Sequence, residues 1–227
     1  MVLEESDLEE ARAVVEEMGT FDYVAKQMSR GHLEPGGFGE EIYAAADAGD
    51  ITEEDAGMLV RAFISAGIDT TVYGIGLTIH ALLHRPEQWA MLHQDPARAK
   101  HAFEEALRFT PPSPVIGRTT SRAFDFRGAR LGAEEKVLMI LSAGNRDPEK
   151  WEDPDTYDIT RRPVGHLAFG SGIHNCVGQM VARLEAEAVM TALARHVRAI
   201  RPAGEAVPVR NNWLRGYEEI PVEVDPA

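Results

Sequence analysis

The stretch LAFGSGIHNCVGQMVARLE, residues Leu167–Glu185, holds the only cysteine in a chain of 227 residues. Glycines flank this cysteine, Cys176, at positions 170, 172 and 178. Because glycine adopts backbone conformations that other residues avoid, the segment predicts an irregular loop whose backbone a bulky, flat group can approach. The helical pattern resumes at Val177. Cys176 is therefore expected directly before a helix N-terminus, where free N–H groups favour a thiolate over a thiol.

A single cysteine has three common roles: buried filler, catalytic nucleophile or metal ligand. The chain offers no second cysteine for a disulfide, a redox pair or a zinc set. A nucleophile would need His174 or His166 as its base, and the close spacing of His174 and Cys176 in a glycine-rich loop controls that geometry poorly. One thiolate can still hold an iron whose in-plane ligands come from a porphyrin.

Phe169, Gly172, Cys176 and Gly178 fit the pattern F-x-x-G-x-x-x-C-x-G. In this the chain resembles the cytochrome P450 family, whose haem-binding signature has this form. The resemblance implies heme (iron protoporphyrin IX, cysteine thiolate ligated) as the cofactor, with Cys176 as the proximal iron ligand. The cofactor-binding residues that it implies in this loop are Phe169, packed near the sulfur, His174, bonded to a haem propionate, and Gly170, Cys176 and Gly178.

A second segment, AGIDTT, matches the family's oxygen-activation motif at Ala66, Gly67, Asp69 and Thr70. Breaking an O–O bond needs protons at the outer oxygen, and a carboxylate beside a hydroxyl in an apolar helix can relay them. The resemblance therefore makes Asp69 and Thr70 the catalytic pair. It assigns Ala66 and Gly67 to the cofactor pocket, where Gly67 leaves room for O2. Without the family context, an Asp-Thr pair is more often a helix cap or a surface feature.

The sequence EALR places Glu105 and Arg108 three residues apart on one helix face, where an ion pair is expected. In the family this is the E-x-x-R motif, completed by a later arginine at the position of Arg161. A buried carboxylate and guanidinium need one another, so the trio is interpreted as structural support for the haem pocket. Arg118, in IGRTT, stands where the family commonly binds the other haem propionate, and a guanidinium suits a carboxylate.

Composition limits the class of protein. The chain is 44% hydrophobic and can bury a core, and one cysteine without a basic and apolar leader favours the cytoplasm. Its 23 Lys and Arg against 37 Asp and Glu give a net charge of -14, which argues against nucleic acid as a partner. The longest apolar region, around 63–83, is interrupted by Asp69 and His80. We therefore predict a buried helix and no membrane span.

Hydrophobic periodicity predicts a mainly α fold with small β-sheets, of the α+β class. Helices are expected over 6–30 with a Ser6 cap, over 38–47, from Thr52 to Pro86, in two pieces within 86–109, and from Val177 onward. In the last helix, Val181, Leu184 and Ala188 are expected to share one apolar face. Short strands are expected within 123–141 and 207–224, and an irregular loop over 142–165. Three glycines within the long helix predict a close neighbour or a bend there: Gly67, Gly74 and Gly76.

The resemblance covers residues 1–227 as the C-terminal part of a cytochrome P450 domain whose N-terminal half is absent. Through PGGFG, LVRAF and NNWLRG it is strongest to soluble bacterial members that oxidise small aromatic carboxylic acids. The substrate positions it implies are Arg61, which would hold the acid, Ser113 and Ile116. Ala62 departs from the serine common in that group, and Ser113 and Ile116 occupy positions that are usually more apolar or aromatic.

The resulting hypothesis is a haem-thiolate monooxygenase that receives electrons from a ferredoxin-type donor and inserts one oxygen atom from O2 into a small organic substrate. Arg183 is a candidate for the docking face of the donor. The alternative is a truncated, non-catalytic remnant, or a folded module that lacks stable haem binding. Apolar faces left open by the missing half are expected to favour association.

Overall fold

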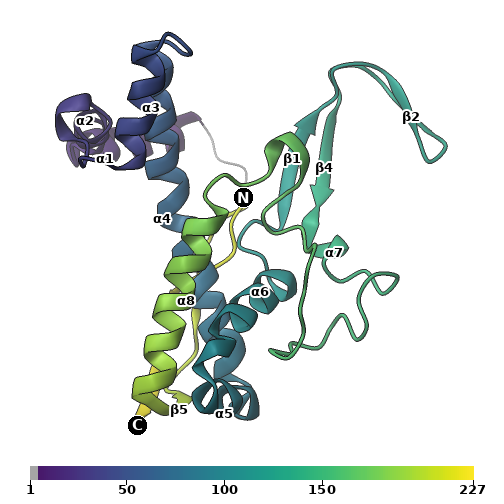
Figure 1. Cartoon of the computed structure of the whole chain (residues 1–227). Coiled ribbons are helices and arrows are strands. Elements are labelled where there is room, and N and C mark those ends of the chain that lie inside the picture. The colour runs from purple at the N-terminus through teal and green to yellow at the C-terminus, as the bar shows by residue number, and fades with distance from the viewer. Residues whose placement is uncertain (1–4) are drawn as a thin grey trace. The chain divides into compact units, whose positions relative to one another are not determined.

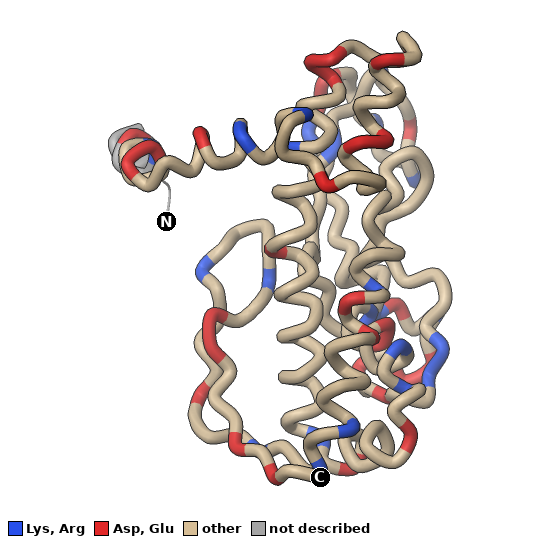
Figure 2. Tube along the Cα trace, turned by 60° about the vertical axis from the view of Figure 1, so that its left-hand side comes forward, with Lys and Arg blue, Asp and Glu red and all other residues tan. Residues whose placement is uncertain are grey.

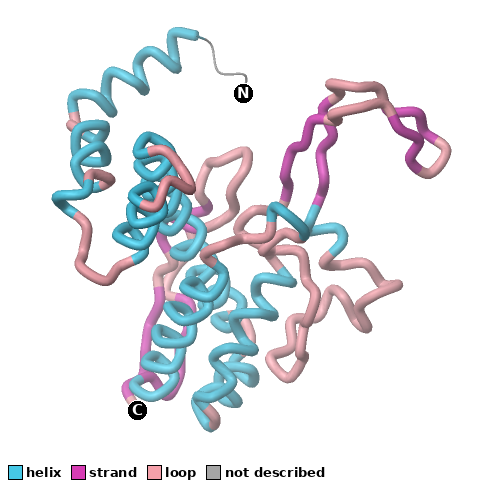
Figure 3. The backbone as a smooth tube through the Cα atoms, turned by 45° about the horizontal axis from the view of Figure 1, so that its top comes forward, coloured by secondary structure: helices cyan, strands magenta, loops and turns pink. Residues whose placement is uncertain are grey.

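The computed structural model describes residues 5–227, without the side chains of residues 5–8, 10 and 11. It consists of two compact units, Met1–Ile68 and Asp69–Ala227. Helix α4 (Glu53–Leu83) runs through the boundary between them. Figure 1 labels the elements and Figure 3 separates helices from strands and loops. The expected mixture of helices and small sheets is confirmed.

The first unit is helical. Besides the start of α4, its elements are α1 (Glu5–Glu17), α2 (Thr20–Gln27), the 3-10 turn η1 (Arg30–His32) and α3 (Phe38–Asp47). The helix over 38–47 is confirmed, but the single helix over 6–30 is wrong. Gly19 has a φ of 65° and separates α1 from α2, because a left-handed residue interrupts a right-handed helix. The Ser6 cap lies outside the described side chains.

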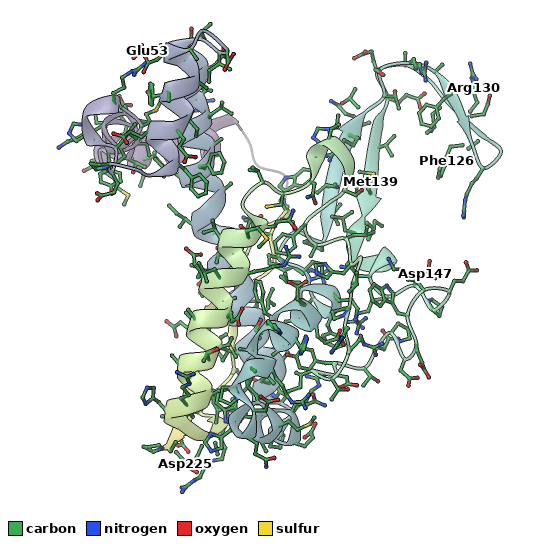
Figure 4. All side chains as sticks on the ribbon, viewed as in Figure 1. Glu53, Phe126, Arg130, Met139, Asp147 and Asp225 are labelled. Atoms are coloured by element: carbon green, nitrogen blue, oxygen red, sulfur yellow. The ribbon has the colours of Figure 1, made fainter. Side chains whose placement is uncertain are left out.

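Tyr43 centres the small core of the first unit. It is buried together with Ala56 and Val60, and its hydroxyl donates a hydrogen bond of 2.8 Å to the Met28 carbonyl. The guanidinium of Arg30 lies 4.6 Å above the Tyr43 ring. The same guanidinium pairs with Asp47 of α3 and with Glu53, which is labelled in Figure 4. These contacts tie α3 to the start of α4.

The N-terminus of α4 is a reciprocal cap, as the sequence predicts. The Asp55 N–H donates to Thr52 Oγ1 over 3.1 Å, and the Thr52 hydroxyl donates to Asp55 Oδ2 over 2.7 Å. These hydrogen bonds hold the pKa of Asp55 below its ordinary value. The helix then runs for 31 residues to Leu83, close to the predicted end.

The expectation that protein surrounds the second half of α4 holds only in part. Leu77, Thr78 and Leu82 are buried, whereas Ile68 and Val72 are 59% and 60% exposed. Asp69 is the only charged residue between Arg61 and Arg85, so the middle of the helix is almost free of charge (Figure 2). By length and composition alone α4 could cross a membrane, which is weak support for a span because core helices of soluble proteins pass the same test.

The helices of the second unit pack around small side chains. Together with the end of α4 they are α5 (Pro86–Gln94), α6 (Ala99–Phe109), α7 (Leu141–Gly144) and α8 (Gln179–His196), with the 3-10 turns η2 (Pro96–Arg98) and η3 (Gly172–His174). Ala102 and Ala106 of α6 are buried against α8, where Met190 and Ala194 are fully buried. The two helical pieces expected within 86–109 are confirmed, and the break between them falls at Asp95 and Pro96.

The strands form two-stranded antiparallel pairs: β1 (Val115–Thr119) with β4 (Lys136–Ile140), β2 (Phe124–Phe126) with β3 (Ala129–Leu131), β5 (Val197–Pro202) with β8 (Val222–Pro226), and β6 (Val207–Pro208) with β7 (Tyr217–Glu219). The register pairs Arg118 with Val137. Arg127 and Gly128 both have positive φ, as a two-residue type I′ hairpin requires. Figure 4 shows this hairpin between Phe126 and Arg130. The strands predicted within 123–141 and 207–224 are confirmed.

The irregular loop expected over 142–165 is confirmed from residue 145 onward, since residues 145–171 contain no helix or strand, but it is wrong at 142–144, which belong to α7. Helix α8 follows, and the prediction of its first residue is wrong. It begins at Gln179 and not at Val177. Its buried face holds Ala186, Met190 and Ala194, whereas Val181 and Leu184 are 42% and 69% exposed.

Candidate functional site

The cysteine loop, which we define as residues 167–178, is closed by its own backbone. The Cys176 N–H donates to the Phe169 carbonyl over 2.8 Å, and the Asn175 N–H donates to the Gly172 carbonyl over 3.0 Å. Gly170 and Gly172 have φ values of 69° and 65°, a conformation that costs other residues strain. The two glycines therefore permit the sharp bend that precedes Cys176.

The surroundings of Cys176 are open. The residue is exposed, and its thiol has no hydrogen-bond partner among the described residues. A Cβ on Gly172 or Gly178 would meet nothing within 4 Å, and the neighbouring Ile173 and Val177 are 97% and 77% exposed. An accessible sulfur among bare glycine backbone and uncovered apolar side chains fits a large, flat and mostly apolar group such as haem.

Neither histidine near the cysteine loop acts as a base for Cys176 in this arrangement. His166 is buried, with Nε2 placed 2.8 Å from Glu104 Oε2 and Nδ1 accepting the Ala168 N–H. His174 is exposed and makes no side-chain hydrogen bond in the part of the chain that the structure describes. A nucleophilic cysteine needs a base within hydrogen-bond reach, so the geometry does not favour the hydrolase alternative.

Phe169 contacts two polar side chains. Arg183 Cζ is 4.4 Å from the ring centroid, and the His166 ring is 5.8 Å from it, centroid to centroid. Phe169 also packs on a buried group that includes Phe103. Arg183 pairs with Glu104, so its charge is balanced within the second unit. This pairing leaves less of the positive charge of Arg183 available to attract an electron-donor protein.

Glu105 and Arg108 form the expected ion pair, and it is completely buried. Arg108 Nε donates to Glu105 Oε2 over 2.8 Å, and Nη2 donates to Oε1 over 2.7 Å. Arg161 Nε adds a third bond to Oε1 at 3.2 Å. The remaining Arg108 N–H groups donate to the carbonyls of Asn145, Pro154 and Thr156. The trio thus fastens α6 to the long loop that leads to Cys176.

Asn145 is a site residue that the sequence analysis missed. It is fully buried, and its Oδ1 accepts the N–H of Leu167, the first residue of the cysteine loop. Its carbonyl accepts Arg108 Nη1 at 3.0 Å. Asn145 therefore connects the ion pair with the cysteine loop. An asparagine followed by Arg-Asp-Pro reads as an ordinary turn, so no signal in a single sequence marks it.

Arg118 lies on β1, half-buried, and its Nη1 donates to the carbonyl of its neighbour Gly117 over 2.8 Å. Among the described residues no carboxylate pairs with it. Arg118 and the exposed His174 thus both retain hydrogen-bonding capacity for an anionic group. Carboxylates such as the haem propionates have the matching chemistry.

The AGIDTT motif lies within α4, where Ala66 and Gly67 belong to the first unit, and Asp69 and Thr70 begin the second. Asp69 is exposed and Thr70 is half-buried. The three helix glycines differ. A Cβ on Gly74 would lie 3.1 Å from Phe103 and one on Gly76 would lie 3.6 Å from Ile220, but one on Gly67 would meet nothing within 4 Å. The predicted close neighbour is present at Gly74 and Gly76 only.

The proposed substrate positions occupy different settings. Arg61 is exposed on α4 in the first unit. Ser113 and Ile116 are half-buried in the second unit. The segment NNWLRG lies beside them, because the Arg215 N–H donates to the Pro112 carbonyl over 2.7 Å and Trp213 approaches Gly117.

Comparisons with known proteins agree with these features. The family model described as Cytochrome P450 matches residues 39–217. Cytochrome p450 CYP199A2 of Rhodopseudomonas palustris is 53% identical over 205 residues, which are 90% of this chain and 50% of that protein. Cytochrome P450 105C1 of a Streptomyces species is 37% identical over 194 residues, covering 81% of this chain and 50% of that protein.

A solved structure gives the same result. The crystal structure of CalO2 superposes on 99% of this chain with a TM-score of 0.85 at 28% identity, and the match covers 57% of the CalO2 chain. The chain spans about half the length of the curated relatives it matches.

Proposed function

The chain belongs to the cytochrome P450 family, and on this premise we propose that it is the haem-binding, oxygen-activating part of a monooxygenase. The reaction would insert one oxygen atom from O2 into a small organic substrate. Haem held by a cysteine thiolate is the cofactor of the family. The observation that carries the proposal is the exposed Cys176, closed into a loop by left-handed Gly170 and Gly172 and bordered by uncovered apolar side chains.

When bound, haem supplies the iron at which O2 is activated, and a thiolate ligand favours cleavage of the O–O bond. The chain's own contribution begins with the Cys176 sulfur as the ligand. Gly170 and Gly178 keep the adjoining backbone free of side chains, and Phe169 covers the loop. Arg118 and His174 would bind the propionates, since neither side chain is committed to a carboxylate of the described protein.

Asp69 and Thr70 would deliver protons. The Asp69 carboxylate is exposed and can exchange protons with water, and Thr70 follows it on α4. Ala66 and Gly67 would leave space for O2, which agrees with the open surroundings of Gly67. Glu105, Arg108 and Arg161 touch no reacting atom in this scheme. They would hold the loop that carries Cys176.

The substrate class that we propose is a small aromatic carboxylic acid. Arg61, whose side chain is exposed, is the residue that we propose for its carboxylate, and Ser113 and Ile116 are the other substrate positions that the family resemblance implies. A ferredoxin-type protein would donate the electrons. We also propose a cytoplasmic location without a membrane or nucleic-acid partner, in line with the net charge of -14 and the single cysteine.

Cys176→Ser provides the test. The purified chain would be loaded with haem, reduced and exposed to carbon monoxide, and its absorption spectrum recorded. We expect the red-shifted Soret band of thiolate-ligated haem from the unaltered chain, and loss of that band from Cys176→Ser because a hydroxyl does not replace the anionic sulfur.

Ser171→Ala is the matched control, since Ser171 lies in the same loop, is exposed and makes no side-chain capping bond. It should keep the band. An unaltered chain that binds no haem would support the alternative of a non-catalytic remnant. A thiolate-type band that persists in Cys176→Ser would refute the assignment of the ligand.

A further inference from the structure

Three polar side chains from three separate segments meet beside the cysteine loop. They are Glu104 of α6, His166 at the end of the long loop, and Arg183 of α8. Glu104 Oε2 lies 2.8 Å from His166 Nε2, and Glu104 Oε1 accepts Arg183 Nε. The His166 side chain is only 3% exposed, and those of Glu104 and Arg183 are 22% and 32% exposed. A partly buried cluster of this kind is costly to build unless its members satisfy one another.

The hydrogen bonds define the state of His166. Nδ1 is 3.2 Å from the Ala168 backbone nitrogen, which can only donate, so Nδ1 must act as an acceptor. Nε2 must then carry the proton and donate it to Glu104. His166 is therefore held as the neutral Nε2–H tautomer, and the negative charge of Glu104 is balanced by Arg183.

Two of the three side chains contact Phe169. The guanidinium of Arg183 lies over the Phe169 ring at 4.4 Å, and the His166 and Phe169 ring centroids are 5.8 Å apart. His166 also binds the N–H of Ala168, the residue before Phe169. Glu104 orients both partners. The Phe169 carbonyl in turn accepts the N–H of Cys176.

We propose that Glu104, His166 and Arg183 are positioning residues that fix Phe169 and, through its carbonyl, the backbone of Cys176. The inference rests on the proposed function, since it gives the cluster the task of presenting the sulfur to iron. Groups that orient a metal ligand commonly change metal affinity or activity by about 10 to 100-fold when they are replaced. None of the three side chains needs to contact the cofactor for this effect.

The first measurement needs no haem. Amide hydrogen exchange of the complete chain reports the hydrogen bond from Cys176 to Phe169, because that N–H exchanges only when the loop opens. Arg183→Met removes the ion pair and the charge above the ring, and we expect exchange at Cys176 to become about tenfold faster or more, as loss of a hydrogen bond to a charged group commonly changes an equilibrium. Amides within α6 should keep their rates. Glu187→Gln, an exposed position on α8, is the control that should change nothing.

The second measurement tests whether Arg183 changes the exchange at Cys176 through the Phe169 ring. In a Phe169→Leu background, Arg183→Met should cause little further change at Cys176, because the link is already broken. An equal acceleration in both backgrounds would overturn the proposal, as would faster exchange throughout α6 and α8 without a local effect. If Arg183→Met does not fold, Arg183→Lys retains the charge but loses the flat guanidinium, and the same comparison applies.

Haem titration separates this inference from the proposed function. If the unaltered chain binds haem, Arg183→Met or Arg183→Lys should raise the dissociation constant by about tenfold. If it binds none, the proposed function fails, while the exchange experiment still decides whether the cluster positions Cys176. An unchanged haem affinity together with unchanged exchange at Cys176 would leave the cluster a purely structural feature and contradict the proposal.

Discussion

At the scale of single residues, Arg108 shows how a buried charge is retained. A guanidinium has five N–H groups, and each of those in Arg108 has an acceptor, two on Glu105 and three on loop carbonyls. Glu105 also accepts Arg161 and the N–H of Asp158. Because both side chains of the pair are fully buried, removing the charge of Glu105 leaves the Arg108 cation without compensation.

We predict that Glu105→Gln lowers the free energy of unfolding by about 3 to 5 kcal/mol, since it leaves the Arg108 cation buried without its anion. Urea denaturation at neutral pH measures this difference. Glu187→Gln, on the exposed surface of α8, should stay within about 0.5 kcal/mol of the unaltered chain. A loss below about 1 kcal/mol for Glu105→Gln would mean that water reaches the pair.

Residue spacing predicted that Glu105 and Arg108 form a pair, but it did not predict the backbone carbonyls that complete their hydrogen bonds. Positions 105 and 108 lie one helical turn apart, which suffices to expect a pair. The carbonyls of Asn145, Pro154 and Thr156 come from a loop without periodicity, so no pattern connects them with Arg108. The same holds for Glu104 and His166, which are distant in sequence and meet only in the folded chain.

At the scale of elements, Gly67 and Gly74 can be compared directly because both lie within α4. A Cβ on Gly67 has open space, whereas one on Gly74 would press against Phe103, which is 2% exposed. Alanine is favoured over glycine within a helix by about 1 kcal/mol. We predict that Gly67→Ala stabilises the haem-free chain by up to about 1 kcal/mol, and that Gly74→Ala gains less or is destabilising.

Thermal unfolding of the two variants against the unaltered chain tests this prediction. The proposed function adds an opposite effect, since Gly67→Ala should weaken carbon monoxide binding to the haem-loaded chain by filling the space left for O2. Equal stability changes for the two substitutions would show that Phe103 moves freely. A Gly67→Ala variant that binds carbon monoxide normally would contradict the role given to Gly67.

The last long helix shows what periodicity leaves open at this scale. It predicted that Val181, Leu184 and Ala188 share an apolar face, but it did not indicate which residues of α8 are buried, and these are Ala186, Met190 and Ala194. The buried alanines of α6 explain this burial, because they leave room for a close partner and α8 meets them with its own small side chains. Hydrophobicity alone does not distinguish a face that packs on this chain from one that stays exposed.

At the scale of the whole molecule, α8 carries exposed apolar side chains near its N-terminus. They are Met180, Val181 and Leu184, which are 69%, 42% and 69% exposed, and Val177 just before the helix is 77% exposed. On β4, Leu138, Met139 and Ile140 are also exposed, and Figure 4 labels Met139. The chain spans about half the length of its relatives, and contiguous apolar surface favours association.

We predict that the purified chain associates at rising concentration and that Leu184→Lys reduces the association. Sedimentation velocity over a range of concentrations measures it. Val164→Lys is the control, because Val164 is 86% exposed but lies in the long loop, away from α8 in sequence. A chain that stays monomeric throughout, or an equal effect of both substitutions, would exclude α8 as the face responsible.

The stability of the fold at low pH is a property of the whole molecule, because the chain has 14 more acidic than basic residues. Burial raises the pKa of Glu104, but the hydrogen bonds from His166 and Arg183 outweigh burial and leave the pKa below its ordinary value. A carboxyl group whose pKa is lower in the folded state stabilises the fold above its unfolded pKa, about 4.3 for glutamate. That contribution is lost as the pH falls through the folded pKa.

We therefore predict that Glu104→Gln destabilises the chain at pH 7 and makes its stability less dependent on pH below about 5, because the substituted side chain no longer titrates. Urea denaturation at several pH values between about 7 and 3 measures both effects, because the loss extends below the unfolded pKa. The difference between the two proteins should shrink toward acid, where protonation removes the same charge from Glu104. Glu187→Gln should leave the pH profile unchanged, and a difference that grows toward acid would mean that Glu104 is stabilised in its neutral form.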